Sequence, residues 1–142
     1  PGELPKTMIE AAWRRLSRLR PRRDDAVEML LAQLTEPKAQ VLFDRPRRPL
    51  SLAAFSRAAA QGRLRLQADA RSRCLFAGQR FAINGEVCPP AAFDRRLAAL
   101  ADARCLDADS LRGAPASLLA LLHDWHVAGW LHLRKERAND DA

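Results

Sequence analysis

The sequence lacks any group of residues that could form a catalytic centre. Its three histidines all lie between His123 and His132, and no cluster of acidic residues and histidines occurs elsewhere in the chain. It also lacks an initiator methionine, because it begins at Pro1 and runs directly into an amphipathic segment. These absences indicate the C-terminal piece of a larger protein, whose function is the contribution of a part to a whole.

Cysteine is scarce as well. Cys74, Cys88 and Cys105 are odd in number and widely spaced, and none belongs to a CxxC motif. A disulfide framework or a zinc site is therefore not expected, and a reducing cytoplasm suits this pattern better. No apolar run approaches the roughly 18–20 residues of a membrane span. No signal peptide is visible, although a fragment without its N-terminus could not show one.

The composition favours a packed protein with a basic surface. Hydrophobic residues make up 48% of the 142 positions and charged residues 29%, which is enough apolar material for one domain or two small units. Lysine and arginine outnumber the acids by 24 to 17, a net charge of +7. A basic surface favours acidic partners such as RNA. The alternatives are a solvated face without a partner and an arginine bias from a GC-rich genome.

Two amphipathic helices are predicted at the start of the chain. Apolar residues recur at three- and four-residue steps over residues 6–20, where Pro21 ends the first helix, and again from Asp24 and Asp25 to about Thr35. Two short helices cannot bury both apolar stripes in each other, so we expect a missing N-terminal part or a second copy to cover them. The residues expected in a dimer interface are Met8, Ile9, Trp13, Leu16, Val27, Leu30, Leu31 and Leu34.

A linker is predicted to follow the second helix. Pro37 stops that helix, residues 41–43 form a short extended apolar run, and residues 45–49 read Arg-Pro-Arg-Arg-Pro. The predicted organisation is a helical dimerisation segment over 1–36, a linker over 37–49, a winged-helix domain over 50–134 and a polar tail over 135–142.

Helices and short strands alternate over residues 50–134. Ser51 is a predicted N-cap, Asn84-Gly85 is typical of a type I′ hairpin turn, and Gly129 is the expected residue just after the last helix. The fold class expected is mainly α with a small β-sheet (α+β), in a winged-helix arrangement. The helices are expected over about 51–62, from Pro89-Pro90 through Phe93, Leu97, Leu100 and Ala101, and from Pro115 to Ala128; the strands are expected near 64–66, 74–76, 81–83, 86–87 and 130–133.

Three stretches of the chain together resemble one family. They are Leu34–Asp44 with its Thr-Glu-Pro-Lys sequence, Arg80–Glu86 with its Ile-Asn-Gly-Glu sequence, and the segment from Leu118 to Leu133. In order and spacing they are similar to the C-terminal half of the bacterial JmjC/cupin-type ribosomal oxygenases. The resemblance spans roughly residues 34–133.

The resemblance implies a three-part parent enzyme. Members of the family are Fe(II)- and 2-oxoglutarate-dependent dioxygenases that hydroxylate an arginine of a large-subunit ribosomal protein. A JmjC barrel holds iron through a His-x-Asp/Glu…His triad, a helical region forms a dimer, and a winged helix closes the chain. The implied partners are a second copy and, through the parent enzyme, the ribosomal protein.

This sequence departs from the family at the catalytic domain. No His-x-Asp or His-x-Glu occurs in it, so no catalytic, cofactor-binding or metal-binding residue can be carried over. Fe(II) and 2-oxoglutarate are expected only in the missing domain. Whether the parent is a working enzyme stays open, and the chain alone is expected to have no oxygenase activity.

Several single residues also allow other interpretations. His123, Asp124 and His126 could be considered as metal ligands, but Asp124 projects to another side of the helix and the histidines are expected to bind the last helix carbonyls. Trp125 and Trp130 are expected to pack in a core rather than to stack on bases. Cys74 is expected to be a small buried hydrophobic residue.

A stand-alone winged-helix module that binds nucleic acid is the alternative function. The last helix, over residues 116–128, contains no arginine or lysine to meet base edges, and Arg95 and Arg96 offer only phosphate contacts. We therefore expect a winged helix that supports dimerisation and substrate presentation. The arginines of residues 45–48 could contact ribosomal RNA or only keep a linker soluble.

Overall fold

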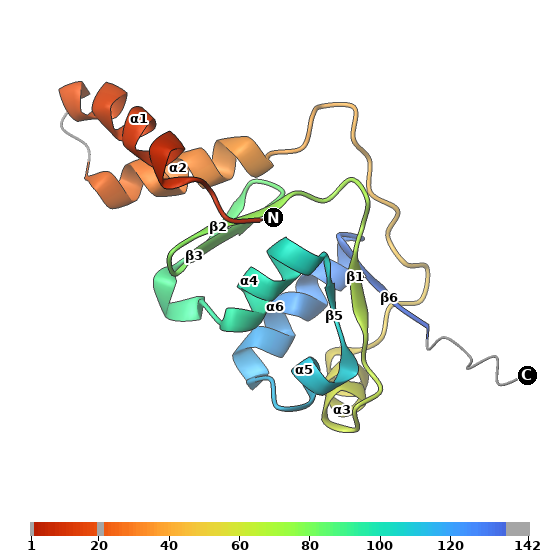
Figure 1. Ribbon diagram of the computed structural model, residues 1–142. Coiled ribbons are helices and arrows are strands. Elements are labelled where there is room, and N and C mark those ends of the chain that lie inside the picture. The colour runs from red at the N-terminus through yellow and green to blue at the C-terminus, as the bar shows by residue number, and fades with distance from the viewer. Residues whose placement is uncertain (1, 20–21, 136–142) are drawn as a thin grey trace, which may run out of the picture. The chain divides into compact units, whose positions relative to one another are not determined.

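The computed structural model describes residues 2–19 and 22–135 of the chain. Pro21 and all but the first residue of the expected polar tail therefore lie outside the described residues. Figure 1 shows the elements along the chain. They are α1 (Lys6–Leu16), η1 (Ser17–Leu19), α2 (Arg23–Thr35), α3 (Leu52–Ala60), β1 (Leu66–Ala68), β2 (Cys74–Ala77), β3 (Arg80–Ile83), β4 (Glu86–Cys88), η2 (Pro90–Ala92), α4 (Arg95–Ala103), β5 (Cys105–Leu106), α5 (Ala108–Arg112), α6 (Ala116–Val127) and β6 (Leu131–Leu133).

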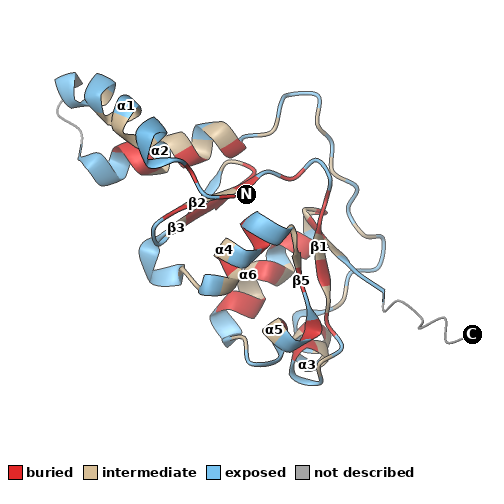
Figure 2. Cartoon of the chain, viewed as in Figure 1, coloured by how far each residue is buried: buried red, intermediate tan, exposed pale blue. Residues whose placement is uncertain are grey.

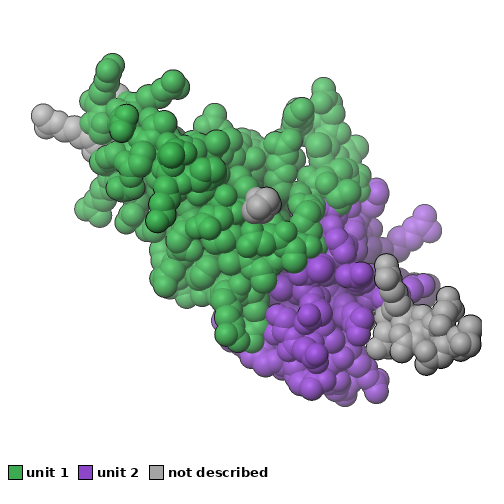
Figure 3. Space-filling model, in the orientation of Figure 1, with its two compact units in different colours: residues 1–42, 70–104 green, residues 43–69, 105–142 purple. Residues whose placement is uncertain are grey.

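The chain divides into two compact units, each made of two segments. Unit 1 holds residues 1–42 and 70–104, and unit 2 holds residues 43–69 and 105–142 (Figure 3). These units do not follow the predicted boundaries at 36 and 50. The predicted domain organisation stays a prediction, because contacts within a folded chain do not show which segments fold or act independently.

Unit 1 is built on an antiparallel sheet in the order β2-β3-β4. The β3–β4 turn has positive φ angles at Asn84 (48°) and Gly85 (88°), which agrees with the predicted type I′ turn. The N-terminal segment extends the other edge of the sheet, since Leu4 N donates to Phe76 O (2.9 Å) and Phe76 N donates to Gly2 O (2.7 Å). Gly2 lies so close to Ala101 that an added Cβ would be 2.2 Å from the alanine Cβ.

Helix α2 covers one face of this sheet. Val27 and Leu31 pack against Ala77 and Ala82 in a buried apolar cluster. Helix α1 packs on α2 but has no buried residue of its own, as Figure 2 shows along its length. The helical pair therefore has one buried layer, under α2, and α1 forms its outer layer.

Unit 2 combines an antiparallel sheet in the order β5-β1-β6 with α3, α5 and α6. Ser51 caps α3 as predicted, because its hydroxyl accepts a hydrogen bond from Ala54 N at 3.1 Å. Three helices around a small three-stranded sheet form a winged helix, so the predicted α+β fold class is confirmed. Its largest fully buried side chains are Phe55, Leu64, Leu66, Leu111, Leu122, Trp125 and Leu131.

Two expectations about local structure were wrong. Residues 70–104 form a second sheet and α4 between β1 and β5, so there are two small sheets rather than one. The helix expected from Pro89 is a short 3₁₀ turn, and α4 begins only after Asp94, whose side chain accepts from Arg96 N at 2.8 Å. The apolar run at 41–43, predicted to be extended, belongs to no helix or strand, and Leu42 is 78% exposed.

Candidate functional site

The first two stretches that carried the resemblance meet at a buried threonine in unit 1. Helix α2 ends at Thr35, because Pro37 cannot continue it and holds Glu36 in an extended conformation (ψ 127°). The fully buried Thr35 hydroxyl donates to Leu31 O at 2.7 Å and accepts from Gly85 N at 3.0 Å. One hydroxyl group thus joins the end of α2 to the β3–β4 turn.

Asn84 secures the other side of this turn. Its buried side chain accepts a hydrogen bond from Arg73 N at 2.9 Å and donates to Ser72 Oγ at 3.1 Å. Asparagine tolerates the left-handed backbone conformation that its position requires. The turn is therefore held to the chain before β2 as well as to α2.

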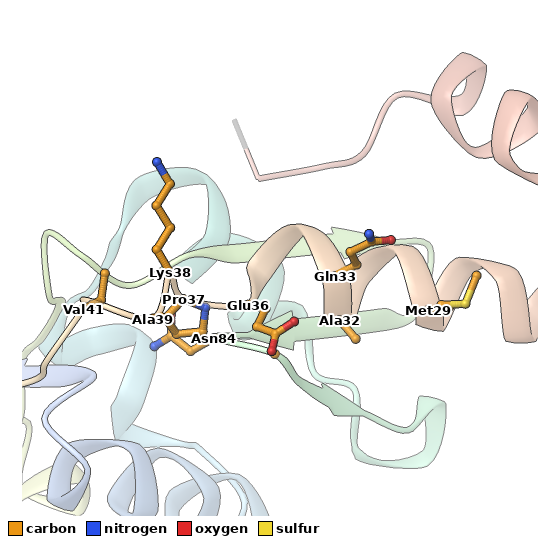
Figure 4. Close-up of a pocket in the computed structure, with 10 residues that line it drawn as sticks. Met29, Ala32, Gln33, Glu36, Pro37, Lys38, Ala39, Val41 and Asn84 are labelled. Carbon is orange, nitrogen blue, oxygen red and sulfur yellow. The ribbon is translucent and has the colours of Figure 1, made fainter.

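An open groove lies between the end of α2 and this turn (Figure 4). Its volume is about 850 Å³, and both polar and apolar side chains line it. Met29, Ala32 and Gln33 come from α2, whereas Lys38 extends away from the groove into solvent (Figure 4). Glu36 and Lys38 are the charged residues among those that line it.

A second cleft, of about 380 Å³, lies between α1 and α2. Met8 and Met29, on opposite helices, are 45% and 48% exposed beside it. Sequence reasoning missed Met29 because it lies outside the α2 stripe that defined the predicted interface. The other residues that line this cleft are Ala11, Ala12, Arg15, Leu16 and Leu30.

The eight residues predicted for a dimer interface divide between surface and core. Val27 and Leu31 are 8% and 0% exposed and belong to the core of unit 1. These two residues are buried because the sheet of unit 1 covers this part of the apolar stripe of α2. The sequence alone did not indicate which surface would cover it. The remaining six residues are partly or largely exposed, namely Met8, Ile9, Trp13, Leu16, Leu30 and Leu34. The dimer itself stays a prediction.

The histidines of α6 bind backbone carbonyls from other segments. His123 donates from Nε2 to Leu50 O at 2.6 Å, and His126 donates from Nδ1 to Leu131 O at 3.2 Å. They do not bind the last carbonyls of their own helix, as had been expected, because α3 and β6 bring closer acceptors. Phe55 packs against both imidazoles, stacked on His126 at 5.9 Å and edge-on to His123 at 5.4 Å.

His126 carries an unsatisfied nitrogen. It is 3% exposed, and its Nε2 has no hydrogen-bond partner among the described residues. Burial lowers the pKa of His126 below its usual value. The hydrogen bond to Leu131 raises this pKa, and the charges of His123 and His132 lower it further, but burial has the largest effect. The ring is therefore held neutral, with Nδ1 as the donor.

The remaining titratable residues of the described ranges do not converge on a metal site. Within the described ranges, no group of three or more histidine, cysteine, aspartate or glutamate side chains is placed to hold a metal ion. Burial raises the pKa of Cys74 to about 12 and that of Cys88 to about 11, so both thiols stay protonated. Cys74 is a buried apolar residue, as expected.

The tryptophans of unit 2 differ in their exposure. Trp125 is 1% exposed and lies in the core, as expected, whereas Trp130 is half-buried and its ring lies 6.2 Å from that of Phe43.

The two arginines considered for phosphate contact, Arg95 and Arg96, differ in whether their charge is paired. Arg96 is bound to Asp94 at 3.0 Å, and Arg95 is exposed.

This combination of a winged helix, an amphipathic helical pair and two polar motifs joined at Thr35 defines the class of the protein. The chain belongs to the family of ROXA-like winged helices, whose model matches residues 15–132. No curated protein matches the chain. In the part of the chain that the structure describes, no helix is long and apolar enough to cross a membrane.

Solved structures of an Escherichia coli protein share this fold. The chain superimposes on ycfD of E. coli with a TM-score of 0.69 and 22% identity, over 92% of this chain and 35% of that one. The ribosomal oxygenase YcfD gives a TM-score of 0.67 at 21% identity, over 93% and 36%. Its complex with cobalt and 2-oxoglutarate gives 0.66 at 21% identity, also over 93% and 36%. The chain thus spans about a third of these proteins' length.

Replacing Thr35 with valine should destabilise the fold by about 1–3 kcal/mol, because the amide of Gly85 would lose its acceptor. The free energy of unfolding in urea measures this change, and hydrogen exchange of the Gly85 amide should become faster. Thr7→Val, at an exposed position of α1, is the control and should change stability by less than about 0.5 kcal/mol. Equal stability of the two variants would contradict the assigned role of the hydroxyl.

Acid should destabilise the protein through His126. A histidine whose pKa is lowered in the folded state binds its proton more readily when unfolded, so its contribution is present above about pH 6.5 and is lost as the pH falls. This single group contributes at most about 1.4 kcal/mol per pH unit to the slope. Urea unfolding from pH 7.5 to 5.5 should show a smaller loss for His126→Phe than for the unmodified chain. An identical pH dependence would contradict the buried, neutral ring.

Proposed function

We propose that this chain is the non-catalytic C-terminal region of an Fe(II)- and 2-oxoglutarate-dependent ribosomal protein hydroxylase of the JmjC type. The observation that carries the proposal is the match of nearly the whole chain to only about a third of a ribosomal oxygenase. The family model for the winged helix, over residues 15–132, supports the same assignment. Iron and 2-oxoglutarate would belong to the remainder of the parent enzyme, since no described residues group into a metal site.

Within such an enzyme, the helical pair α1–α2 would support a homodimer. An amphipathic helix without a buried residue leaves its apolar stripe exposed unless another surface covers it. That apolar surface lies at one cleft, which is lined by Met8, Leu16 and Met29. The small side chains of Ala11 and Ala12 in the same cleft allow another helix to approach closely. A second copy of the same cleft is the simplest cover, because isologous contacts between identical surfaces close on themselves.

The winged helix would help to present the ribosomal protein substrate. Unit 2 contributes a rigid surface rather than reactive groups, since its two α6 histidines are bound to Leu50 and Leu131. The absence of arginine and lysine from α6 supports a contact with protein rather than readout of a DNA groove.

The coding sequence upstream of Pro1 tests the assignment to a larger enzyme. An in-frame JmjC domain, with His-x-Asp/Glu and a later histidine, is the expected result. A start codon directly before Pro1 would contradict the assignment and favour a stand-alone binding module. The purified chain by itself should not turn over 2-oxoglutarate with iron.

Met8→Glu should weaken the proposed dimer at least about tenfold, because a carboxylate would be buried in each half of the interface. Sedimentation equilibrium over a range of concentrations measures the change. Thr7→Glu adds the same charge at the neighbouring exposed position of α1, which does not line the cleft, and should leave the dimer intact. A chain that stays monomeric at every concentration, or equal weakening by both variants, would contradict this interface.

A further inference from the structure

The predicted linker is a segment held against unit 2 at both ends. At its start, the Phe43 ring packs on Trp130, and the carbonyl oxygen of Asp44 lies so close to Gly129 that an added Cβ would be 2.6 Å from it. At its end, Leu50 O accepts the hydrogen bond from His123 at 2.6 Å. Residues 43–50, here called the Pro/Arg segment, therefore have a defined path over unit 2.

Three arginine side chains of the Pro/Arg segment expose their positive charges to solvent. Arg45, Arg47 and Arg48 are exposed, and no carboxylate of the described residues forms an ion pair with them. Pro46 and Pro49 fix two φ angles and so reduce the conformations open to the arginines between them. A pre-ordered row of charges loses less entropy on binding than the same charges on a flexible chain.

Further positive charge lies on the sheet of unit 2. Arg134, at the end of β6, donates its backbone N–H to Arg65 O, next to β1, at 2.9 Å. Residues 43–69 contain six arginines but only two acids, and one of these, Asp69, is buried and bound to His132 Nε2 at 2.6 Å. Arginines therefore outnumber acids in this segment of unit 2, which suits a polyanion.

An aromatic pair lies at the beginning of the same segment. Phe43 and Trp130 are each half-buried, with ring centroids 6.2 Å apart and planes inclined by 59°. Exposed ring surface beside a row of arginines is the combination that binds single-stranded nucleic acids, where bases stack on rings and phosphates meet the cations. Duplex DNA is read by a helix in a groove, and α6 has no basic residue for that task.

We propose that the Pro/Arg segment, together with Trp130 and Arg134, forms a binding site for single-stranded RNA. The arginines contact phosphates, and the indole ring of Trp130 stacks on an unpaired base. RNA is the chosen partner because its loops and ends present unpaired bases that proteins recognise in this way. The site does not depend on the proposed function, since it uses surface residues of unit 2 alone.

The test is fluorescence anisotropy of the 142-residue chain with a fluorescein-labelled, single-stranded RNA of mixed sequence, at several salt concentrations. The triple variant R45Q/R47Q/R48Q should lower the affinity at low salt about tenfold or more. It should also reduce the slope of log K against log salt by about 2, since each phosphate contact on a single strand contributes roughly 0.7. Trp130→Leu should weaken binding about fivefold or more and leave the slope unchanged.

The matched control is R14Q/R18Q/R22Q, which removes three exposed arginines from unit 1 and lowers the net charge of +7 equally. It should keep most of the affinity and the slope. Equal losses in both triple variants would overturn the proposal, because net charge alone would then explain binding. Tighter binding to polyglutamate or to duplex DNA than to RNA would also overturn it. Circular dichroism identifies a variant that has unfolded, and the two triple variants decide the question even if Trp130→Leu does not fold.

Discussion

The hydrogen bonds of the Thr35 hydroxyl are the constraint on which unit 1 depends. A helix end and a hairpin turn both leave backbone groups without partners, and burial makes such groups costly. The Thr35 hydroxyl supplies an acceptor to one amide of the turn, that of Gly85, and donates its own hydrogen to Leu31 O within α2. The helix therefore cannot shift along the sheet without breaking one of these bonds, and the groove beside the turn keeps its shape.

The sequence predicted local structure well where a single residue decides the conformation. Asn84-Gly85 specifies its turn through the positive φ angles that these two residues tolerate, and Ser51 specifies a helix start through its own side chain. It failed where the signal is short or the determinant is distant. Helix α5 spans only Ala108–Arg112, less than the length over which apolar periodicity is visible, and Asp94 rather than a proline sets the start of α4.

The candidate surfaces were harder to predict than the elements that carry them. Val27 and Met8 are both apolar residues on helical stripes, and the pattern alone does not say which of them a sheet will cover. The covering strands lie about 50 residues further along the chain, beyond the reach of helical periodicity. The contacts of residues 43–50 could not be predicted for a similar reason, since their partners lie near the far end of the chain, at His123, Gly129 and Trp130.

The insertion of residues 70–104 between β1 and β5 gives the fold a nested connectivity. Strand β1 cannot pair with β5 until those residues are folded back, and closing so long a loop costs entropy that short hairpins do not incur. Because unit 1 takes one segment from before the Pro/Arg segment and one from after it, a proteolytic cut there would leave unit 1 in two pieces, whereas unit 2 would lose only part of the Pro/Arg segment itself. Since residues 70–104 of unit 1 also separate the two segments of unit 2, a single exchange that replaced both segments of unit 2 would replace this part of unit 1 as well.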